Sequence, residues 1–539
     1  VTNDYKGKTY IVDGQQRLTS LTLILIKLYH LAEKLDLELR KDLIKEHVMG
    51  AGLSGHTFWM GQDDRKDVLE DLFINEKQTI ENSADDITTR NLYRNYEVID
   101  RKLEAFLLTC HKFEAFLYYF LTRVMLVKIH IQETENVPMV FEVINDRGER
   151  LKPYEVLKGK LLGQIDKEDI DTYHSIWQEH IPNIQSIDER EVDTFFRFYF
   201  RSKYVDSRAE YREFDGEYHK TVYEEKWDKR IQLKQNSLGV KQFIKGELEY
   251  YARLYLKVLL DSKRGKPQVS PHLFFNALNE QDRQFLLVLS ACETNDSEEL
   301  DKIRLVTWLF DKHFTLLQLT GAYDSNRFTE SLISLNKNIR NKSCEEIKAI
   351  YNQQIVDDIS ASKDVEVRTP FEWTYFKNAS NRNLRIRFIR YYFARIEHFI
   401  AEHCNRTPES YYNLVRNTGR KHGYHIEHII ADNEENWRLF DNDEEAFHTE
   451  RNKLGSLLLL KGRDNQSSSN EVYSEKLKTY SGTLLWNQTL CPDFYHSNKD
   501  FQDFMSKFNL DFKPYEVFDG TAVLERQKLL FELTKLIWA

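Results

Sequence analysis

The hydrophobic and polar positions at the start of the chain predict a strand, a polar turn and a helix. Residues 8–12 form a short β-rich run, and an apolar-rich run extends over residues 18–39. The polar turn between them consists of Asp13, Gly14, Gln15, Gln16 and Arg17. Binding groups often lie on such turns, because the backbone there is exposed.

Helical and β-branched patterns continue through the next part of the chain. Apolar residues recur at helical spacing over residues 89–122, and the run at 124–131 predicts a buried strand. A second polar motif covers residues 141–151, and Pro153 favours the first turn of a new helix. Residues 167–365 show amphipathic helices, with loops expected near 203–238 and 262–271, and no catalytic signature.

The last third combines basic and apolar segments. A basic helix is expected over residues 384–403, a basic loop over 416–422 and a short β-like run over 424–430. A leucine-rich run follows at 454–460.

The β-like run carries the strongest chemical pattern. Glu427 and His428 are adjacent, and Asn465 follows the leucine-rich run. This order suits a phosphodiesterase with one metal ion, because histidine can deprotonate water near neutral pH. The oxygens of Glu427 and Asn465 are ligands that Mg²⁺ or Mn²⁺ prefers.

Composition and charge narrow the class of protein. The 539 residues suggest about three domains at roughly 150 residues each. A content of 29 Tyr, 33 Phe and 8 Trp fits a packed, helical protein. The net charge of -10 argues against a uniformly basic nucleic-acid surface, so phosphate contacts must come from local clusters. Five widely spaced cysteines and the lack of a membrane span or signal sequence fit a cytoplasmic protein.

The basic segments before the β-like run are candidates for such a cluster. They would attract DNA phosphates without reading sequence, although a solvated helix face paired with acidic residues is an equal alternative. The helix contributes Arg382, Arg385, Arg387, Arg390 and Arg395, and the loop contributes Arg416, Arg420 and Lys421.

The pattern around His428 resembles the ββα-metal (HNH) finger and, more narrowly, the C-terminal domain of the GmrSD-type, type IV restriction endonucleases. The resemblance implies that His428 is the general base and that Glu427 and Asn465 are metal ligands. It makes Lys476 a phosphate contact or a helix-packing residue, and we take His425 as structural or auxiliary.

Two positions depart from the family pattern. Ser456 stands where the family has an asparagine that braces the loop of the base, and Ala431 stands where a proline is common. A serine hydroxyl can still hydrogen-bond a backbone group.

The N-terminal turn is open to two interpretations from its residues. Asp13 can cap the following helix, or the turn can bind an anion, with Gly14 permitting unusual backbone angles and Arg17 offering a two-pronged phosphate contact. The motif resembles the ParB/sulfiredoxin-like N-terminal domain of the same family, which binds and hydrolyses nucleoside triphosphate. The resemblance extends to Phe141, Asn145, Arg147, Gly148, Leu151, Glu155 and Lys158.

The family domain has some tens of residues before this motif, so we expect a truncated pocket. The expected fold is α+β and predominantly α-helical, with a ParB/sulfiredoxin-like nucleotide-binding domain over residues 1–165, a helical middle over 166–365 and a ββα-metal nuclease domain over 366–539.

The expected function is a metal-dependent, nucleotide-regulated DNA endonuclease that cleaves modified phage DNA in antiviral defence. Two alternatives remain: a nucleotide-dependent binding or switch protein with a degenerate finger, and an RNA-cleaving toxin. The choice among GTP, ATP, UTP and CTP and the formation of a homo-oligomer stay open.

Overall fold

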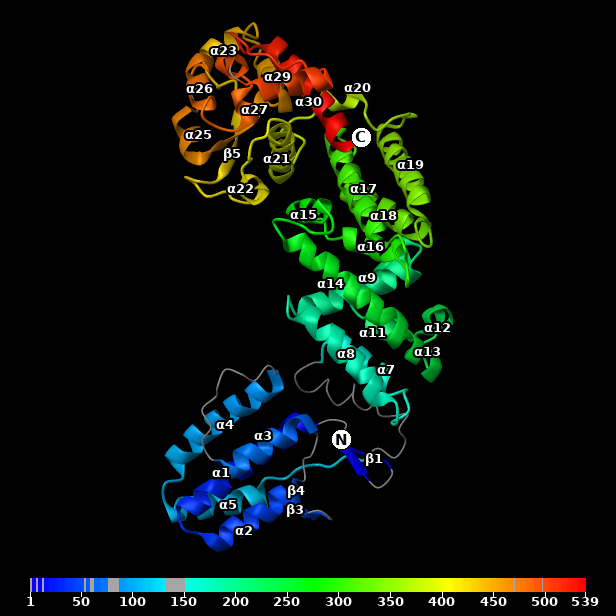
Figure 1. The fold of residues 1–539 in the computed structure, drawn as a ribbon, viewed down its shortest axis with the longest axis vertical. Helices are drawn as coiled ribbons and strands as arrows, with labels where there is room; N and C mark the ends of the chain where they lie inside the picture. Colours follow the sequence, from blue (N-terminus) through cyan, green and yellow to red (C-terminus); the bar gives the residue numbers. More distant parts are fainter. Residues whose placement is uncertain are drawn as a thin grey trace. The chain divides into compact units, whose positions relative to one another are not determined.

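The computed structural model describes residues 2–5, 8–11, 14–52, 55–58, 63–75, 87–130, 151–468, 471–496 and 498–539. Its contacts divide the chain into two compact units, Val1–Lys152 and Pro153–Ala539. Both units are mainly helical, and the strands of the described residues form three separate antiparallel pairs (Figure 1). The predominantly helical class predicted from the sequence is confirmed.

The first unit is a small helical layer with two strand pairs. Leu23 and Ile26 belong to a buried core with Leu69 and Leu92, because the apolar stripes of the helices face one another. The elements are β1 (Thr2–Tyr5), β2 (Lys8–Ile11), α1 (Gln15–Lys34), α2 (Glu38–Val48), β3 (Met49–Gly52), β4 (Gly55–Phe58), α3 (Asp63–Ile74), α4 (Ile87–Phe106) and α5 (Cys110–Arg123).

Several boundaries in this unit differ from the sequence prediction. The helix expected over 18–39 begins at Gln15 and ends at Lys34, and the run at 89–122 forms the two helices α4 and α5. The buried strand expected at 124–131 is wrong for its described residues, since Met125 is 88% and Val127 86% exposed. In the described part of the chain a single bridge to Thr2 pairs this segment, and β-branched residues form a strand only where a partner strand lies beside them.

The second unit opens with an array of helices that starts at Pro153, as predicted. Short helices interrupt the loop expected near 203–238, whereas residues 264–270 are a loop as expected. The elements are α7 (Pro153–Leu162), α8 (Ile170–Gln185), α9 (Arg190–Tyr204), α10 (Arg208–Glu213), α11 (Tyr218–Thr221), α12 (Glu225–Ile231), α13 (Ser237–Gln242), the π-helix η2 (Phe243–Leu248), α14 (Glu249–Lys263), α15 (Pro271–Leu278), α16 (Gln284–Ala291), α17 (Glu299–Leu319), α18 (Ser325–Asn338) and α19 (Cys344–Lys363).

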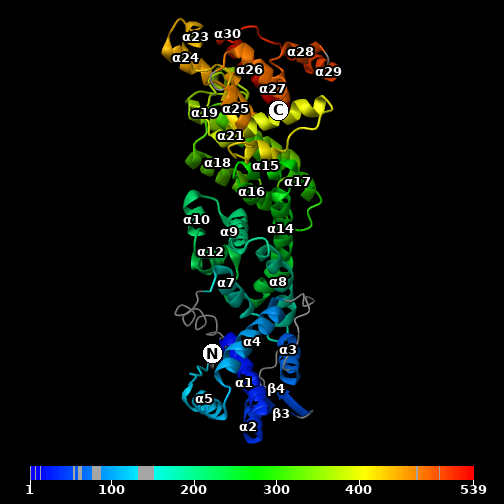
Figure 2. The ribbon, with the colours of Figure 1, turned by 90° about the vertical axis from the view of Figure 1, so that its left-hand side faces the viewer.

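The rest of the second unit contains the strand pair β5–β6, on which the candidate site is built. Figure 2 shows α25 and α26 beside each other above α21. The elements are α20 (Trp373–Phe376), α21 (Ile386–His403), α22 (Tyr411–Val415), β5 (Tyr424–His428), α23 (Glu434–Arg438), α24 (Glu444–Arg451), the 3₁₀ helix η3 (Leu454–Ser456), β6 (Leu457–Lys461), α25 (Gly462–Ser468), α26 (Tyr473–Tyr480), α27 (Leu485–Gln488), α28 (Pro492–His496), α29 (Lys499–Phe508) and α30 (Gly520–Trp538).

The helical middle and the C-terminal region share one core. Asp311 of α17 is fully buried and accepts hydrogen bonds from Arg395 of α21 at 2.6 Å and from the indole of Trp538 at 3.1 Å. Its carboxylate also lies 3.0 Å from His272 Nδ1 of α15. Because these groups come from both sides of the boundary expected near residue 365, the two regions form one folded unit.

None of the helices in the described residues has the length and apolar character needed to cross a membrane. All five cysteines are free thiols.

Candidate active site

The site is built on the strand pair β5–β6 and the helix that follows it. The strands are antiparallel, with Tyr424 opposite Lys461 and His428 opposite Leu457. The helix α25 begins directly after β6 and packs against both strands. Gly462 allows this close turn, since a Cβ there would lie 2.1 Å from the carbonyl oxygen of Arg420. The arrangement has the order strand, strand, helix, with α23 and α24 inserted between the strands.

His428 is the last residue of β5 and is half-buried. Its Nε2 lies 3.0 Å from the side-chain nitrogen of Asn381 and 3.2 Å from the side-chain oxygen of Asn452. Burial, followed by the charge of Arg451, lowers the pKa of His428 to about 4. The imidazole is therefore neutral at pH 7, as a general base must be.

The two amides beside His428 are held by a short ladder of hydrogen bonds. The amide N–H of Asn381 donates to the carbonyl of Asn452 at 2.9 Å, and that of Leu454 donates to Ala379 at 3.1 Å. Gln527 of α30 joins the two segments, since its side chain accepts from the Gly455 N–H at 2.6 Å and donates to the Ala379 carbonyl at 3.1 Å. The helix α30 thus fixes the surroundings of the histidine.

Glu427 points to the opposite face of β5 from His428, because side chains alternate along a strand. Lys476 of α26 donates to its Oε1 at 2.6 Å and to the carbonyl of His428 at 2.8 Å. The side chains of this pair are 7% and 1% exposed. Burial raises the pKa of Glu427 and lowers that of Lys476, while the pairing opposes both shifts. Of the two roles predicted for Lys476, the buried geometry favours helix packing.

Two family models match the chain. The model described as GmrSD restriction endonuclease, N-terminal domain, matches residues 1–162, and that described as GmrSD restriction endonucleases, C-terminal domain, matches residues 361–532. Together they cover more than half of the chain, and the second spans the whole site from Asn381 to Gln527. The chain belongs to the GmrSD family of restriction endonucleases. No curated protein matched its sequence.

Membership of the GmrSD family makes the chain an endonuclease of the type IV restriction class, with DNA as the substrate. The resemblance to the GmrSD family seen in the sequence is thereby confirmed.

The residues predicted as metal ligands of this GmrSD chain lie on the α25 side of β5. His425 shares that face with Glu427, and its Nε2 is buried with no hydrogen-bond partner in the described residues. A Cβ on Gly462 would lie 3.2 Å from the His425 ring, and Asn465 lies one turn further along the same side of α25.

Within the described residues, no three His, Cys, Asp or Glu side chains gather as a metal cluster. A carboxylate and an amide oxygen are the kinds of ligand that Mg²⁺ prefers, and here the carboxylate of Glu427 is paired with Lys476.

Ser456 of the GmrSD chain braces the site through its backbone. Its carbonyl accepts from the Ile429 N–H at 2.9 Å, which extends the strand pairing beyond His428. The side chain is fully buried, and its hydroxyl has no hydrogen-bond partner among the described residues. Ala431 is also buried, directly after the strand.

The basic segments only partly match the prediction of a DNA surface. The expected patch is wrong for Arg390 and Arg395, which are 2% and 7% exposed because their guanidinium groups bond within the core. Arg416 donates to the Ala277 carbonyl at 2.8 Å and pairs with Glu280 at 3.1 Å, so its terminal nitrogens are engaged by α15 and its loop. Of the three Arg and Lys residues predicted in the loop, Arg420 and Lys421 are exposed.

The N-terminal motif of the GmrSD chain is described only from Gly14 onward. Gly14 has φ +102°, a left-handed conformation that favours glycine, and Gln15, Gln16 and Arg17 form the first turn of α1. Lys158 lies in α7 of the other unit, with its Nζ 3.0 Å from His174 Nε2. The residues of both motifs that lie outside the described residues are Asp13, Phe141, Asn145, Arg147 and Gly148.

Sequence reasoning missed three residues of the site. Asn452 directly precedes the Lys453-Leu454-Gly455-Ser456 motif, and Arg451 precedes it, so attention to the polar residues ahead of that strand would have found both. No local signal marks Asn381, which contacts His428 across 47 positions of sequence.

Proposed function

We propose that this chain is a metal-dependent, nucleotide-regulated endonuclease that cleaves modified phage DNA with His428 as the general base. The observation that carries the proposal is the environment of His428, a neutral imidazole at the end of a strand with one ring nitrogen within hydrogen-bond distance of two side-chain amides.

The hydrogen bonds of His428 suit proton transfer from water. The Asn381 nitrogen can only donate and the Asn452 oxygen can only accept, so Nε2 makes one of these two hydrogen bonds in each tautomer. When Nε2 carries the hydrogen and donates to the Asn452 oxygen, the other ring nitrogen, Nδ1, is the base. No partner occupies Nδ1 among the described residues. A pKa of about 4 makes the resting base weak, but an anionic phosphate beside the ring raises its pKa and so strengthens it.

Arg451 supplies a positive charge next to the base. Its Nε donates to the Ile430 carbonyl at 3.0 Å, which fixes the guanidinium near the end of β5. The two terminal nitrogens have no partner in the described residues and are suited to a two-pronged phosphate contact. We assign Arg451 to the scissile phosphate.

Glu427 and Asn465, with His425 beside them, would hold the metal ion. A bound Mg²⁺ or Mn²⁺ supplies charge stabilisation for the leaving oxygen. Because Glu427 and His428 point to opposite faces of β5, both act on one phosphate only if it lies across the end of the strand.

Arg420 and Lys421 extend the phosphate path from the other end of β5. A strand rises about 3.4 Å per residue, so Tyr424 lies roughly 14 Å from His428. One DNA strand carries a phosphate about every 3.4 Å of helix axis. The loop would therefore contact the backbone a few nucleotides from the cut.

For the N-terminal unit we propose triphosphate binding by Gly14, Gln15, Gln16 and Arg17. The support is the left-handed Gly14 at the start of the long helix α1, together with the family match over residues 1–162.

A second candidate is a nucleotide-dependent binding protein in which the finger is structural only. The ion pair between Glu427 and Lys476 favours it, because a paired carboxylate is a weaker metal ligand. Metal-dependent cleavage separates the two candidates.

The deciding experiment is a cleavage assay on modified phage DNA, unmodified DNA and RNA, with Mg²⁺, Mn²⁺ or EDTA, with and without triphosphate. His428→Ala should lower the rate about 10²–10⁴-fold, the usual effect of losing a general base. His496→Ala is the matched control, since His496 is exposed on α28. Full activity of a folded His428→Ala protein would refute the assignment of His428 as the general base.

A further inference from the structure

A polar cavity of about 560 Å³ lies beside the turn that carries Asn381. Its walls come from the end of α17, the start of α18, the end of α19, α20 and the turn before α21. The volume falls within the range of roughly 300–1,000 Å³ that small-molecule sites occupy. The residues that bear on its chemistry are Tyr323, Lys363, Tyr375, Asn378, Asn383 and Arg385.

The cavity and the proposed active site lie on two sides of one turn. Asn383, on the cavity side, accepts hydrogen bonds from the Ser380 N–H at 3.0 Å and its hydroxyl at 3.2 Å. Asn381, on the other side, contacts His428. Two residues of chain span at most about 7 Å, so the wall of the cavity and the partner of the base are close neighbours.

The cavity combines positive charge with aromatic surface. Arg385 is exposed, and its guanidinium makes no hydrogen bond or ion pair in the described residues. Lys363 Nζ lies 5.2 Å from the centre of the Tyr375 ring and donates to the Gly321 carbonyl at 3.3 Å. The carboxylate of Asp324 is engaged by the first backbone amides of α18, at 3.0 and 2.9 Å. The lining therefore combines cationic, aromatic and amide groups with one carboxylate that caps α18.

We propose that this cavity receives one nucleotide of the DNA strand, extruded from the stack next to the scissile phosphate. Arg385 would pair with its phosphate, Tyr375 would stack on its base, and Asn378 would hydrogen-bond the edge of the base. Enzymes that extrude nucleotides hold them by this combination of stacking and edge contacts. The inference rests on the proposed function, because it needs the cut to occur at His428.

The test uses duplexes that carry 2-aminopurine, a base whose fluorescence rises when it unstacks, at successive positions around the cut. The protein is the full chain with His428→Ala, so that the DNA stays intact, and gels check this. Binding should raise the emission at one position only. Tyr375→Ala should remove that rise and weaken affinity roughly 5- to 150-fold, the range for one lost stacking contact.

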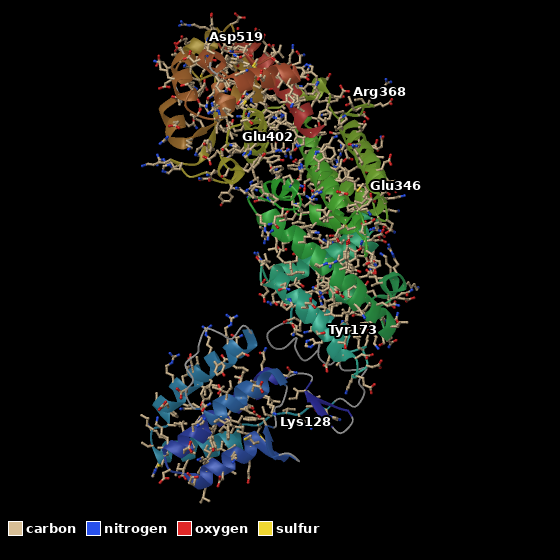
Figure 3. All side chains as sticks on the ribbon, viewed as in Figure 1. Lys128, Tyr173, Glu346, Arg368, Glu402 and Asp519 are labelled. Carbon is tan, nitrogen blue, oxygen red and sulfur yellow. The ribbon has the colours of Figure 1, made fainter. Side chains whose placement is uncertain are left out.

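Arg385→Ala should weaken binding and lower the salt slope by about one counterion. Arg368→Ala is the matched control, because Arg368 is an exposed arginine in the loop between α19 and α20 and does not line the cavity (Figure 3).

Emission and affinity in Tyr375→Ala and Arg385→Ala equal to those of Arg368→Ala would overturn the nucleotide site. Cleavage of the duplex in the His428→Ala background would instead refute the proposed function, while the binding signal still reports on the cavity.

Discussion

Replacing Lys476 with methionine would leave the carboxylate of Glu427 buried without its cation. The two side chains are 1% and 7% exposed, and the lysine also donates to the His428 carbonyl at 2.8 Å. Removing one partner of a buried ion pair destabilises a protein by about 3–5 kcal/mol. Whole domains are stable by only about 5–15 kcal/mol, so Lys476→Met should measurably increase the local opening of β5.

The loss of stability in Lys476→Met should depend on pH, because the buried carboxylate of Glu427 loses its charge when it takes up a proton. Without the lysine, the folded-state pKa of Glu427 rises further above its ordinary value of 4.5. A carboxyl with a raised folded pKa destabilises the protein above its unfolded pKa, and the penalty disappears as pH falls below it. The stability that Lys476→Met loses relative to the wild type should therefore be large at pH 7 and small near pH 4.

Hydrogen exchange of the peptide over β5 is the suitable measurement, because it reports local opening in a chain of two units. Lys478→Met is the control on the same helix, since Lys478 is 73% exposed and a surface pair contributes at most about 1 kcal/mol. The double variant Lys476→Met with Glu427→Leu should recover much of the protection, because no buried charge remains.

Equal protection of β5 in Lys476→Met and Lys478→Met would refute this reasoning. Mg²⁺ adds a second comparison. If Glu427 binds the metal, Mg²⁺ should restore protection to Lys476→Met by replacing the lost positive charge, and an absence of any recovery would count against Glu427 as a ligand.

Three further changes test the site. Gly455→Ala should lower the melting temperature, because a Cβ there would lie 2.5 Å from the Val523 carbonyl oxygen of α30; an unchanged melting curve would contradict the tight packing. Ser456→Asn should destabilise by about 1–3 kcal/mol, since the position is fully buried, whereas Ser456→Ala should be near neutral in the same denaturant titration. Because the folded pKa of His428 is about 4, the neutral imidazole costs the folded state nothing above pH 6.5, and the free energy of unfolding falls by up to about 3 kcal/mol as the pH drops from 6.5 through 4. His428→Gln should therefore unfold at a lower pH than the wild type in an acid titration. An unchanged midpoint would argue against a buried neutral imidazole.

The sequence alone was sufficient for the local elements of the site and for the family. The sequence predicts a β-like run over 424–430, where β5 ends at His428, and a leucine-rich run at 454–460, most of which lies in β6. The helix start at Pro153 follows from the preference of proline for a first turn, and all these signals are local properties of the chain. The family motifs are equally local, since each consists of residues that are close together in the sequence. The sequence also predicted the helix α21 correctly, within two residues of its start.

Only the tertiary structure decided which charged and polar groups meet. The sequence pattern predicts Arg395 in a basic patch, but it pairs with Asp311, 84 positions earlier, inside a shared core. The buried partner of Lys476 and the contact of Asn381 with His428 likewise join residues 49 and 47 positions apart. The physical reason is that helical periodicity identifies an apolar face but not the element that packs on it, and a charged side chain is buried or exposed according to that partner.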